Sequence, residues 1–390
     1  MYLYCWNLGG TWLCIYAVVR TASKMLGRYT CPSQRSKLST LVHLLAVTIF
    51  LILIVNICAF WTGFNHVVKY GHYTAAQVPN KIDDLFIRKI ELSPGANPHR
   101  YRFLTSLGDK CRGKNVFLVV VVTSAPAHVR QRDAIRKTWG NETMFPQGTV
   151  RVLFALGRSD DAQLEKTVQK EIKTNGDIIQ EDFRDTYRNL TTKTVMILRW
   201  AVTFCSGARY VMKTDDDMFV NIKTLVSNLK YLELEVDLSS GLLMGPIQTG
   251  VHPIRSRSNK YYVSEEDFNG DVYPDYLSGT GYVMSMGAVR RLYVTSLMTS
   301  PMPMEDVYMG ICAKKAGISP RDHSGFTFHQ FGFTVCTHRL IVTSHHYTPT
   351  ELFTMWAALQ SSPECGRLQT YFSTLYAKLV NIVSFLNIPV

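Results

Sequence analysis

Three absences restrict what this 390-residue chain can be. Its nine cysteines include no C-x-x-C pair, which argues against a structural zinc site. Residues 1–40 contain five Lys or Arg but no Asp or Glu. Residues 41–61 contain no Asp, Glu, Lys or Arg. That apolar run reaches the ~20 residues needed to cross a bilayer, and only Thr48 and Asn56 interrupt it strongly. No small-residue cleavage signature follows it, so we predict an uncleaved transmembrane anchor.

The distribution of charge sets the expected topology and excludes one class of partner. The formal net charge is +12, and residues 1–40 account for five of these charges. Basic residues beside a span favour the cytosol, so we expect a cytosolic tail at 1–40 and a lumenal bulk. The remaining positive charge is spread along the chain, which argues against nucleic-acid binding. Whether the chain starts at Met1 or Met25 stays open.

Beyond the anchor, composition predicts a stem over residues 62–112 and a catalytic domain over 113–366. Strands with near-continuous apolar character alternate with helical patterns, which is typical of an α/β domain with a mostly parallel sheet flanked by helices. The expected strands are 116–122, 150–156, 177–180, 210–215 and 283–285, and the expected helices are 130–139, 161–173, 191–204 and 307–316. In such sheets ligands bind beyond the carboxyl ends of strands, where Thr123 and Asp215 fall.

Three consecutive carboxylates, Asp215, Asp216 and Asp217, end the fourth of these strands. An acidic surface turn is the simpler interpretation, but apolar residues enclose the run on both sides. Crowded carboxylates in an apolar frame are costly to desolvate without a cation. The stretch therefore predicts a site for Mn²⁺ or another hard divalent cation.

Three other features are candidates for chemistry. Arg132 and Arg136 share one helix face and suit a diphosphate, although a solvated basic face is the alternative. The stretch from Tyr273 to Tyr282 offers aromatic rings for sugar stacking and glycines for close approach, or an ordinary turn. Glu305 and Asp306 begin a helix, where they serve either as N-terminal acids or as a general base.

Cysteines and sequons give further expectations. Five cysteines lie beyond the anchor, so a lumenal location predicts disulfides with one thiol left over, in a pairing that the sequence does not fix. Asn141 and Asn189 begin N-x-T sequons. Several histidines close the domain, and one of them could complete a metal shell begun by Asp217.

Together, four ordered motifs resemble the animal β-1,3-galactosyltransferase family, type II Golgi membrane enzymes. The matching stretches are Arg132–Gly140, Tyr210–Asp217, Tyr273–Tyr282 and Glu305–Gly310. The resemblance covers roughly residues 113–365 and implies a GT-A nucleotide-sugar-binding fold. It also implies a single-pass Golgi membrane protein with a lumenal catalytic domain.

The resemblance implies a role for each matching residue. Asp306 corresponds to the catalytic base, and Asp217, His345 and Asp215 correspond to residues around a bound Mn²⁺. Positions near the donor UDP-sugar are Arg132, Arg136, Thr123, Lys213, Asp215 and Asp216. Positions near the sugar and acceptor are Tyr276, Gly279, Thr280, Gly281 and Glu305. Leu277 stands where relatives usually carry Cys, which puts one family disulfide in doubt.

The implied activity is an inverting transfer of galactose from UDP-galactose to the 3-hydroxyl of a terminal N-acetylhexosamine on a glycoprotein or glycolipid glycan. One alternative is a β-1,3-N-acetylglucosaminyltransferase that uses UDP-GlcNAc. An alternative of another class is a non-catalytic Golgi lectin or chaperone on the same fold. Relatives end near Cys365, whereas here an apolar tail, 367–390, follows with helical spacing of Leu375, Leu379 and Val383. This tail could pack on the domain or touch a membrane.

Overall fold

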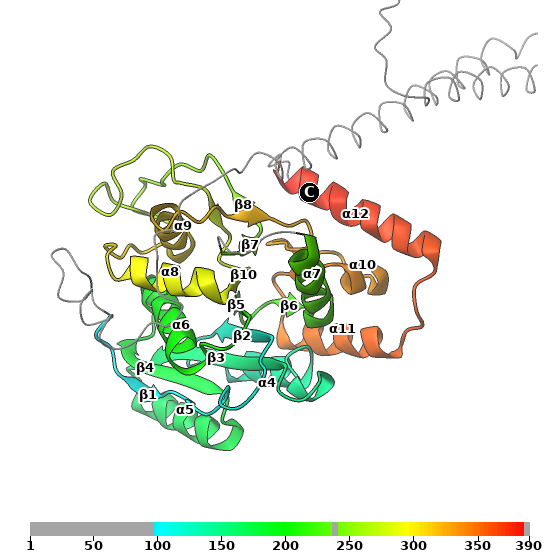
Figure 1. The fold of residues 1–390 in the computed structure, drawn as a ribbon, viewed down its shortest axis with the longest axis horizontal. Coiled ribbons are helices and arrows are strands. Elements are labelled where there is room, and N and C mark those ends of the chain that lie inside the picture. The colour runs from blue at the N-terminus through cyan, green and yellow to red at the C-terminus, as the bar shows by residue number, and fades with distance from the viewer. Residues whose placement is uncertain (1–96, 98, 236–240, 386–390) are drawn as a thin grey trace, which may run out of the picture. The chain divides into compact units, whose positions relative to one another are not determined.

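In the computed structural model, residues 97, 99–235 and 241–385 are described. Their centre is an eight-stranded sheet of order β1-β4-β3-β2-β5-β10-β7-β11, with helices on both faces (Figure 1). Its strands are β1 (Phe103–Thr105), β2 (Leu118–Thr123), β3 (Val150–Arg158), β4 (Ile178–Arg184), β5 (Tyr210–Asp215), β7 (Leu243–Gly245), β10 (Gly281–Ser285) and β11 (Arg321–Asp322). Two short pairs join β12 (Thr343–Ser344) to β6 (Phe219–Val220) and β8 (Ile247–Gln248) to β9 (Tyr276–Leu277).

The four helices expected at 130–139, 161–173, 191–204 and 307–316 are present to within a few residues, and the structure adds others. The helices are α4 (Val129–Lys137), α5 (Ala162–Asn175), α6 (Leu190–Phe204), α7 (Ile222–Glu235), α8 (Met286–Ser296), α9 (Glu305–Lys315), α10 (Val335–Leu340), α11 (Pro349–Ser361) and α12 (Arg367–Phe385). Two 3₁₀ turns, η1 (Glu142–Met144) and η2 (Tyr187–Asn189), complete the set. Asp161 caps α5 by accepting hydrogen bonds from the first-turn amides, as a short acidic side chain does at a helix start.

The apolar run over β2 is buried because β2 lies between two parallel strands, β3 and β5, and helices cover both faces. All six of its residues are buried. Val119 and Val121 join the core on the side of α6 and α8, while Val120 and Val122 join the core on the side of α4 and α11. The period-two alternation of a strand thus fills two hydrophobic cores.

The prediction of a mostly parallel sheet is confirmed in part: the pairs β4–β3, β3–β2, β2–β5 and β7–β11 are parallel, and the other pairs are antiparallel. β1 pairs with β4 antiparallel, and β10 runs antiparallel to both β5 and β7. The chain enters β10 through Thr280, whose carbonyl accepts a hydrogen bond from the Asp215 amide at 3.2 Å. This hydrogen bond adjoins the antiparallel pairing of β10 with β5, so the sheet is mixed.

The predicted segments before and after the catalytic domain are only partly covered by the described residues. The predicted cytosolic tail and the anchor at 41–61 lie outside the described residues, and within the described part no helix is long and apolar enough to cross a membrane. β1 lies in the segment assigned to the stem, so the sheet includes residues before 113. The 113–366 and 367–390 boundaries stay predictions, although α12 now gives the tail a helical structure over Arg367–Phe385.

The expected disulfides with one thiol left over are confirmed. Cys111 bonds to Cys205, and Cys336 bonds to Cys365. Cys312 on α9 is free and buried, and burial raises the pKa of its thiol to about 11. Among the described residues, the covalent links therefore tie the segment before β2 to the end of α6, and α10 to the segment that leads into α12.

Candidate active site

Two of the three acids that end β5 are held by side chains from the β2 edge. Asp215 accepts hydrogen bonds from the Thr123 hydroxyl at 2.5 Å and from Lys213 at 2.9 Å. Asp216 accepts from the Ser124 hydroxyl at 2.6 Å and pairs with His128 Nδ1 at 2.9 Å. β2 and β5 run parallel with Thr123 opposite Asp215, so both donors reach the acids directly.

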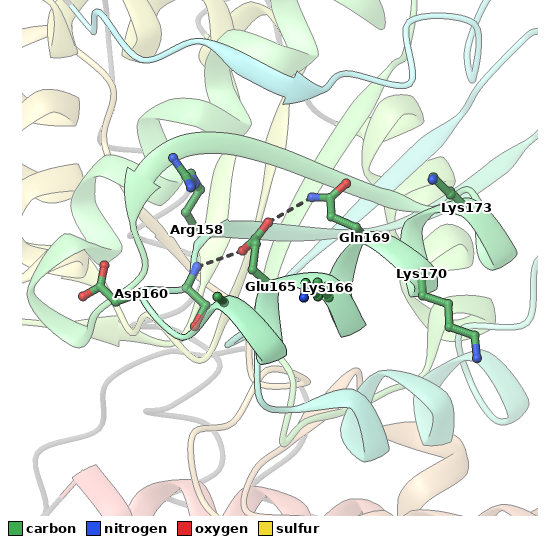
Figure 2. A pocket seen from close by; sticks show the side chains of 9 residues that line it. Arg158, Asp160, Glu165, Lys166, Gln169, Lys170 and Lys173 are labelled. Carbon is green, nitrogen blue, oxygen red and sulfur yellow. Dashed lines mark hydrogen bonds between the residues drawn. The ribbon is translucent and has the colours of Figure 1, made fainter.

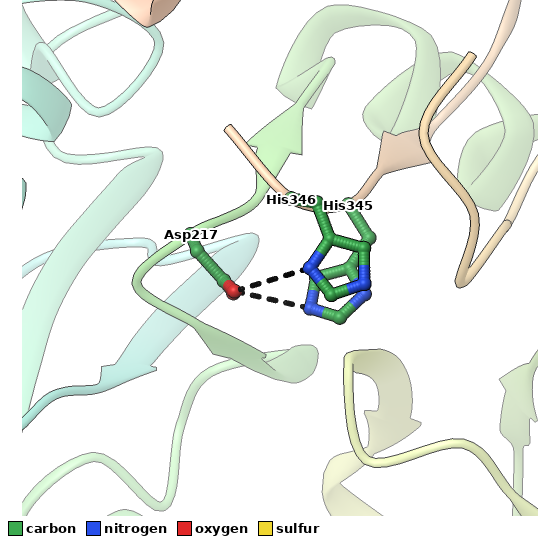
Figure 3. A group of neighbouring side chains, drawn as sticks. All are labelled: Asp217, His345 and His346. Atoms are coloured by element: carbon green, nitrogen blue, oxygen red, sulfur yellow. Dashed lines mark ion pairs between the residues drawn. The ribbon is translucent and has the colours of Figure 1, made fainter. Parts of the chain in front are cut away.

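The third acid, Asp217, faces two histidines that come from far along the chain (Figure 3). His345 Nε2 lies 3.2 Å from an Asp217 carboxylate oxygen, and His346 Nδ1 lies 3.9 Å from the same oxygen. The pairing of β12 with β6 brings these segments together, and the Tyr347 amide donates to the Asp217 carbonyl. The three side chains offer ligand atoms that lie within 4.8 Å of one another.

The chemistry of this group suits a divalent cation. His345 Nδ1 lies 3.1 Å from the Phe328 carbonyl, which leaves Nε2 directed at Asp217. Burial alone would raise the pKa of Asp217, but the hydrogen bond and charge of His345, with smaller contributions that include His346, together lower that pKa. Carboxylate and imidazole are ligand types that Mn²⁺ accepts, so the residues fit the predicted ion. The structure brings predicted ligands Asp217 and His345 together and adds His346, while Asp215 is engaged by Thr123 and Lys213.

Glu305, predicted near the acceptor, is instead buried and fully engaged. Its carboxylate accepts hydrogen bonds from Thr194 at 2.9 Å and from Tyr282 at 2.7 Å, and Lys213 Nζ lies 3.4 Å away. Lys213 also donates to Asp215 and to the Gly279 carbonyl. Lys213, predicted near the donor, is thus a buried link between Asp215 at the end of β5 and Glu305 at the start of α9.

Asp306 is half-buried and has few hydrogen-bond donors. The Val307 amide donates to it at 2.9 Å, and the Gly279 amide is its second donor. Burial first, and then the negative charge of Glu305, raise the pKa of Asp306 to about 6. A carboxylate with a pKa near neutral is suited to accept a proton, which is what a general base requires.

The Ser278–Gly281 turn packs between the two acidic groups. A Cβ atom at Gly279 would lie 3.0 Å from the Glu305 carboxylate and 3.6 Å from the Asp306 Cβ, so only glycine fits without displacement. Thr280 accepts from the Asp215 amide, and Gly281 pairs with Thr214 inside the sheet. The close approach predicted for these glycines is therefore to the protein itself.

The aromatic residues of the predicted sugar-stacking loop are buried. Tyr276 is 8% exposed and packs on Gly310 of α9, while Tyr282 is 1% exposed with its hydroxyl on Glu305. Tyr273 packs edge-on against Tyr276 with ring centroids 6.3 Å apart. Their rings support the start of α9, and a direct stacking surface at Tyr276 is not what the structure shows.

The two arginines predicted at the diphosphate also have other partners. Arg132 is fully buried and donates to both Glu171 oxygens, to the Ser124 hydroxyl and to the carbonyls of Ala125 and Pro126. Those contacts use its fork of five N–H groups, which leaves none for a ligand. Arg136 pairs with Asp177 and Glu171 at 2.7 Å. Arg132 therefore supports the turn that carries Ser124, while a diphosphate contact of Arg136 stays a prediction.

Cations without such partners occur nearby, beyond the end of β3. Arg158 and three lysines of α5 line a pocket of about 560 Å³ (Figure 2). Its two acids are already engaged: Asp160 pairs with Arg184 at 2.6 Å, and Glu165 accepts from the Ser159 amide. Within the described residues, these lining cations have no ion-pair partner. The lysines are Lys166, Lys170 and Lys173.

Two neighbours of the site, His128 and Tyr187, were missed by sequence reasoning, and His346 was only one of several histidines considered for the metal shell. His128 precedes α4 and reaches Asp216, and its only signal is its place in the loop after β2. Tyr187 of η2 is 50% exposed, and its pKa is raised to about 12 by burial first, with contributions from Tyr261, Asp306 and Asp215. The charges of Asp306 and Asp215 thus act on its hydroxyl. His346 adjoins His345 in the sequence, which offered one signal for it.

The two sequons occupy helix-start positions. Asn141 accepts hydrogen bonds from the amide and hydroxyl of Thr143 at the start of η1. Asn189 donates to the Arg184 carbonyl at 2.9 Å before α6. Both side chains are partly exposed. Glycosylation at either residue stays a prediction.

Comparison with known proteins gives one family. A family model described as galactosyltransferase matches residues 130–324. A mouse β-1,3-galactosyltransferase 1 is 37% identical over 292 residues, which cover 75% of this chain and 87% of that protein. A mouse β-1,3-galactosyltransferase 5 is 40% identical over 266 residues, covering 67% and 85%.

A relative with another named donor also matches. A Xenopus laevis lactosylceramide 1,3-N-acetyl-β-D-glucosaminyltransferase B is 34% identical over 328 residues, covering 82% of this chain and 85% of that protein. The family-model match includes the arginines of α4, the acids that end β5, the Ser278–Gly281 turn and the start of α9. The family-model match does not include Thr123, Ser124 and His128, which precede it, or the histidines at 345 and 346, which follow it.

Proposed function

This chain belongs to the galactosyltransferase family of hexosyltransferases, and on that premise we propose that it transfers galactose from UDP-galactose to the 3-hydroxyl of a glycan acceptor with inversion. The acceptor is a terminal N-acetylhexosamine or related sugar on a glycoprotein or glycolipid. One observation carries the proposal: Asp306, with a pKa raised to about 6, lies across the Ser278–Gly281 turn from the acids that end β5. The mixed α/β sheet is consistent with a GT-A arrangement, which belongs to the same proposal.

A divalent cation, Mn²⁺ by preference, completes the donor side of this proposal. Asp217 and His345 would hold it, with His346 close enough to assist. When bound, the cation would neutralise negative charge on the diphosphate leaving group. Asp216, fixed by Ser124 and His128, would then orient ribose or sugar hydroxyls.

The proton transfer would fall to Asp306. Its carboxylate removes the proton from the acceptor 3-hydroxyl while that oxygen forms a bond to the anomeric carbon. The bond from that carbon to the diphosphate oxygen breaks with its electron pair, and UDP leaves. Attack from the opposite face turns an α-linked donor into a β-linked product. Asp306 must therefore lie within hydrogen-bond reach of the hydroxyl when the acceptor is bound.

The choice of donor has one competitor. Similarity to β-1,3-galactosyltransferases favours UDP-galactose, and similarity to the Xenopus N-acetylglucosaminyltransferase keeps UDP-GlcNAc as the second candidate. A non-catalytic lectin or chaperone would not need Asp306 kept near neutral pKa beside a fully engaged Glu305. That pairing of a prepared base with a neighbouring acid group supports catalysis.

The proposed location is the Golgi membrane, with the catalytic part in the lumen. Two disulfides among the described residues suit an oxidising compartment. The anchor at 41–61 and the two sequons belong to the same proposal.

The decisive experiment is a donor and acceptor panel with linkage analysis. Full-length enzyme is incubated with Mn²⁺, UDP-galactose or UDP-GlcNAc, and acceptors that end in β-linked N-acetylglucosamine or N-acetylgalactosamine. We expect a β-1,3-linked galactose product. Transfer of N-acetylglucosamine alone would select the second candidate. Absence of transfer with every pair, by protein that still binds UDP with Mn²⁺, would favour the lectin alternative.

A further inference from the structure

The helix α12 has its polarity reversed relative to a helix that packs on a core. Over residues 367–377, where its side chains are described, the partly buried residues are small or polar, Thr370, Ser373 and Ala377, on the side that packs beside α10. Large apolar residues are exposed instead. Leu368 is 74% exposed, and Tyr371 and Phe372 are 64% and 62% exposed.

These exposed residues form one stripe. Leu368, Tyr371, Phe372 and Leu375 follow the i, i+3, i+4, i+7 spacing that aligns side chains along a helix. No other helix among the described residues exposes so many large apolar side chains within two turns. A contiguous exposed apolar surface marks an interaction site when it is this concentrated.

The charge of the segment favours a lipid surface as its partner. Residues 366–390 contain no Asp or Glu, while Arg367 and Lys378 are basic. Aromatic residues such as Tyr371 and Phe372 prefer the boundary between headgroups and acyl chains. Helices with an apolar aromatic stripe and basic flanks lie in that boundary plane.

Other arrangements fit less well. A self-associating coiled coil needs apolar a and d positions over at least three heptads with charged pairs beside them, but α12 has only 19 residues and residues 366–390 contain no acid. Crossing the bilayer is also disfavoured, since no described helix is long and apolar enough. We propose that α12 lies on the membrane surface through the stripe Leu368, Tyr371, Phe372 and Leu375, and that the basic charge of the segment favours anionic headgroups. This contact is independent of the transferase chemistry proposed above.

The test places a tryptophan on the stripe and measures its contact with acyl chains. Full-length Phe372→Trp protein is reconstituted in phosphatidylcholine vesicles with about 30% phosphatidylserine, with and without brominated acyl chains. The matched control is Phe353→Trp on α11, where the native phenylalanine is 40% exposed. Native tryptophans give the same background in both variants, and subtraction of wild-type intensity isolates the added residue.

We expect brominated lipid to remove about half or more of the fluorescence added by Phe372→Trp and little of that added by Phe353→Trp. Reversal of both basic residues, Arg367→Glu with Lys378→Glu, should reduce the quenching at position 372 severalfold.

Two results would overturn the proposal. One is quenching at position 372 that is no greater than the quenching at position 353. The other is protection of position 372 from water that is lost when fewer copies of the protein are present per vesicle. That result would show that a second copy, rather than lipid, covers the stripe. Transferase activity is measured in parallel and should not change in either tryptophan variant.

Discussion

The end of β5 and the start of α9 both carry adjacent carboxylates, yet their surroundings prepare them for opposite tasks. Asp217 lies beside two histidines, and the hydrogen bond from His345 lowers its pKa despite burial. Asp306 has no cationic partner in direct contact among the described residues, and burial with the charge of Glu305 raises its pKa to about 6. Under the proposed function, one acid would hold a cation in its ionised form, and the other would take a proton.

The same contrast separates the two neighbours at the start of α9. Glu305 takes the donors that the interior offers, from Thr194, Tyr282 and Lys213. Asp306 is left with two backbone amides. A buried carboxylate that is satisfied stays a structural anion, whereas an under-satisfied neighbour has its proton affinity raised. Adjacent positions on one helix therefore divide support from chemistry.

The largest effect should follow removal of the base. Asp306→Asn keeps the shape of the side chain but cannot accept the acceptor proton, so kcat should fall by roughly 10²- to 10⁴-fold. Binding of UDP with Mn²⁺ should stay within about twofold, because Asp306 lies on the acceptor side. Steady-state kinetics and calorimetric UDP binding measure the two quantities.

The matched control is Asp275→Asn, the same chemical change at an exposed carboxylate in the same region. It should leave kcat unchanged. Equal activity of Asp306→Asn and wild type would remove Asp306 from the base role, and equal loss in both variants would point to a general charge effect.

The second effect tests the cation side. His345→Ala should raise the Mn²⁺ concentration needed for half activation by roughly 10- to 100-fold, since a ligand atom is lost. His346→Ala is the matched control, because its ring lies 3.9 Å from Asp217 and is more exposed. We expect at most a few-fold change there. Metal titration of activity and of Mn²⁺-dependent UDP binding distinguishes them, and a larger effect at His346 would reverse the assignment.

A third experiment changes the pH dependence of the reaction while Asp306 and Asp217 both stay in place. Wild-type kcat/KM should fall below pH 6, because the base works only when ionised and its pKa in the free enzyme is about 6. Glu305→Gln removes the neighbouring negative charge that raises this pKa, so the acidic limb should move to lower pH by roughly one pH unit. The profile of kcat/KM against pH measures the position of the acidic limb in both proteins.

Thr194→Val is the control for Glu305→Gln. It removes a hydrogen bond to Glu305 but keeps the charge, so the acidic limb should not move. A shift in both variants would assign the effect to packing rather than to charge. Melting temperatures of both proteins show whether Lys213 tolerates the loss of its buried partner.

Sequence pattern predicted what depends on one strand or helix, and missed what depends on partners across the fold. The run over β2 predicted a strand buried on both faces because its period and its length are local properties. The antiparallel direction of β10 was missed because it depends on the Thr280 contact with Asp215, sixty-five residues earlier in the chain. The tertiary partners of charged residues are even harder to predict from the sequence.

Arg132 shows the limit most clearly. Its spacing from Arg136 indicated a basic face, but Glu171 on α5 and the carbonyls after β2 use its donors. The carboxylates Glu305 and Asp306 look equivalent in the sequence, and only the positions of Thr194, Tyr282 and Lys213 separate them. Residue type and order therefore located the acids, while their roles required the tertiary partners.

The smallest effect concerns His128, which sequence reasoning missed. Its ring lies 2.9 Å from Asp216, and this hydrogen bond first of all raises its pKa. The side chain is 45% exposed, so solvent weakens the pair, and His128→Ala should raise the donor KM only about two- to fivefold. Because the charged histidine supports Asp216 below its pKa and loses its charge as pH rises, the gap between wild type and variant should narrow at higher pH. Donor KM measured at several pH values tests this, and a gap that widens with pH would show that the neutral ring, rather than the charged one, positions Asp216.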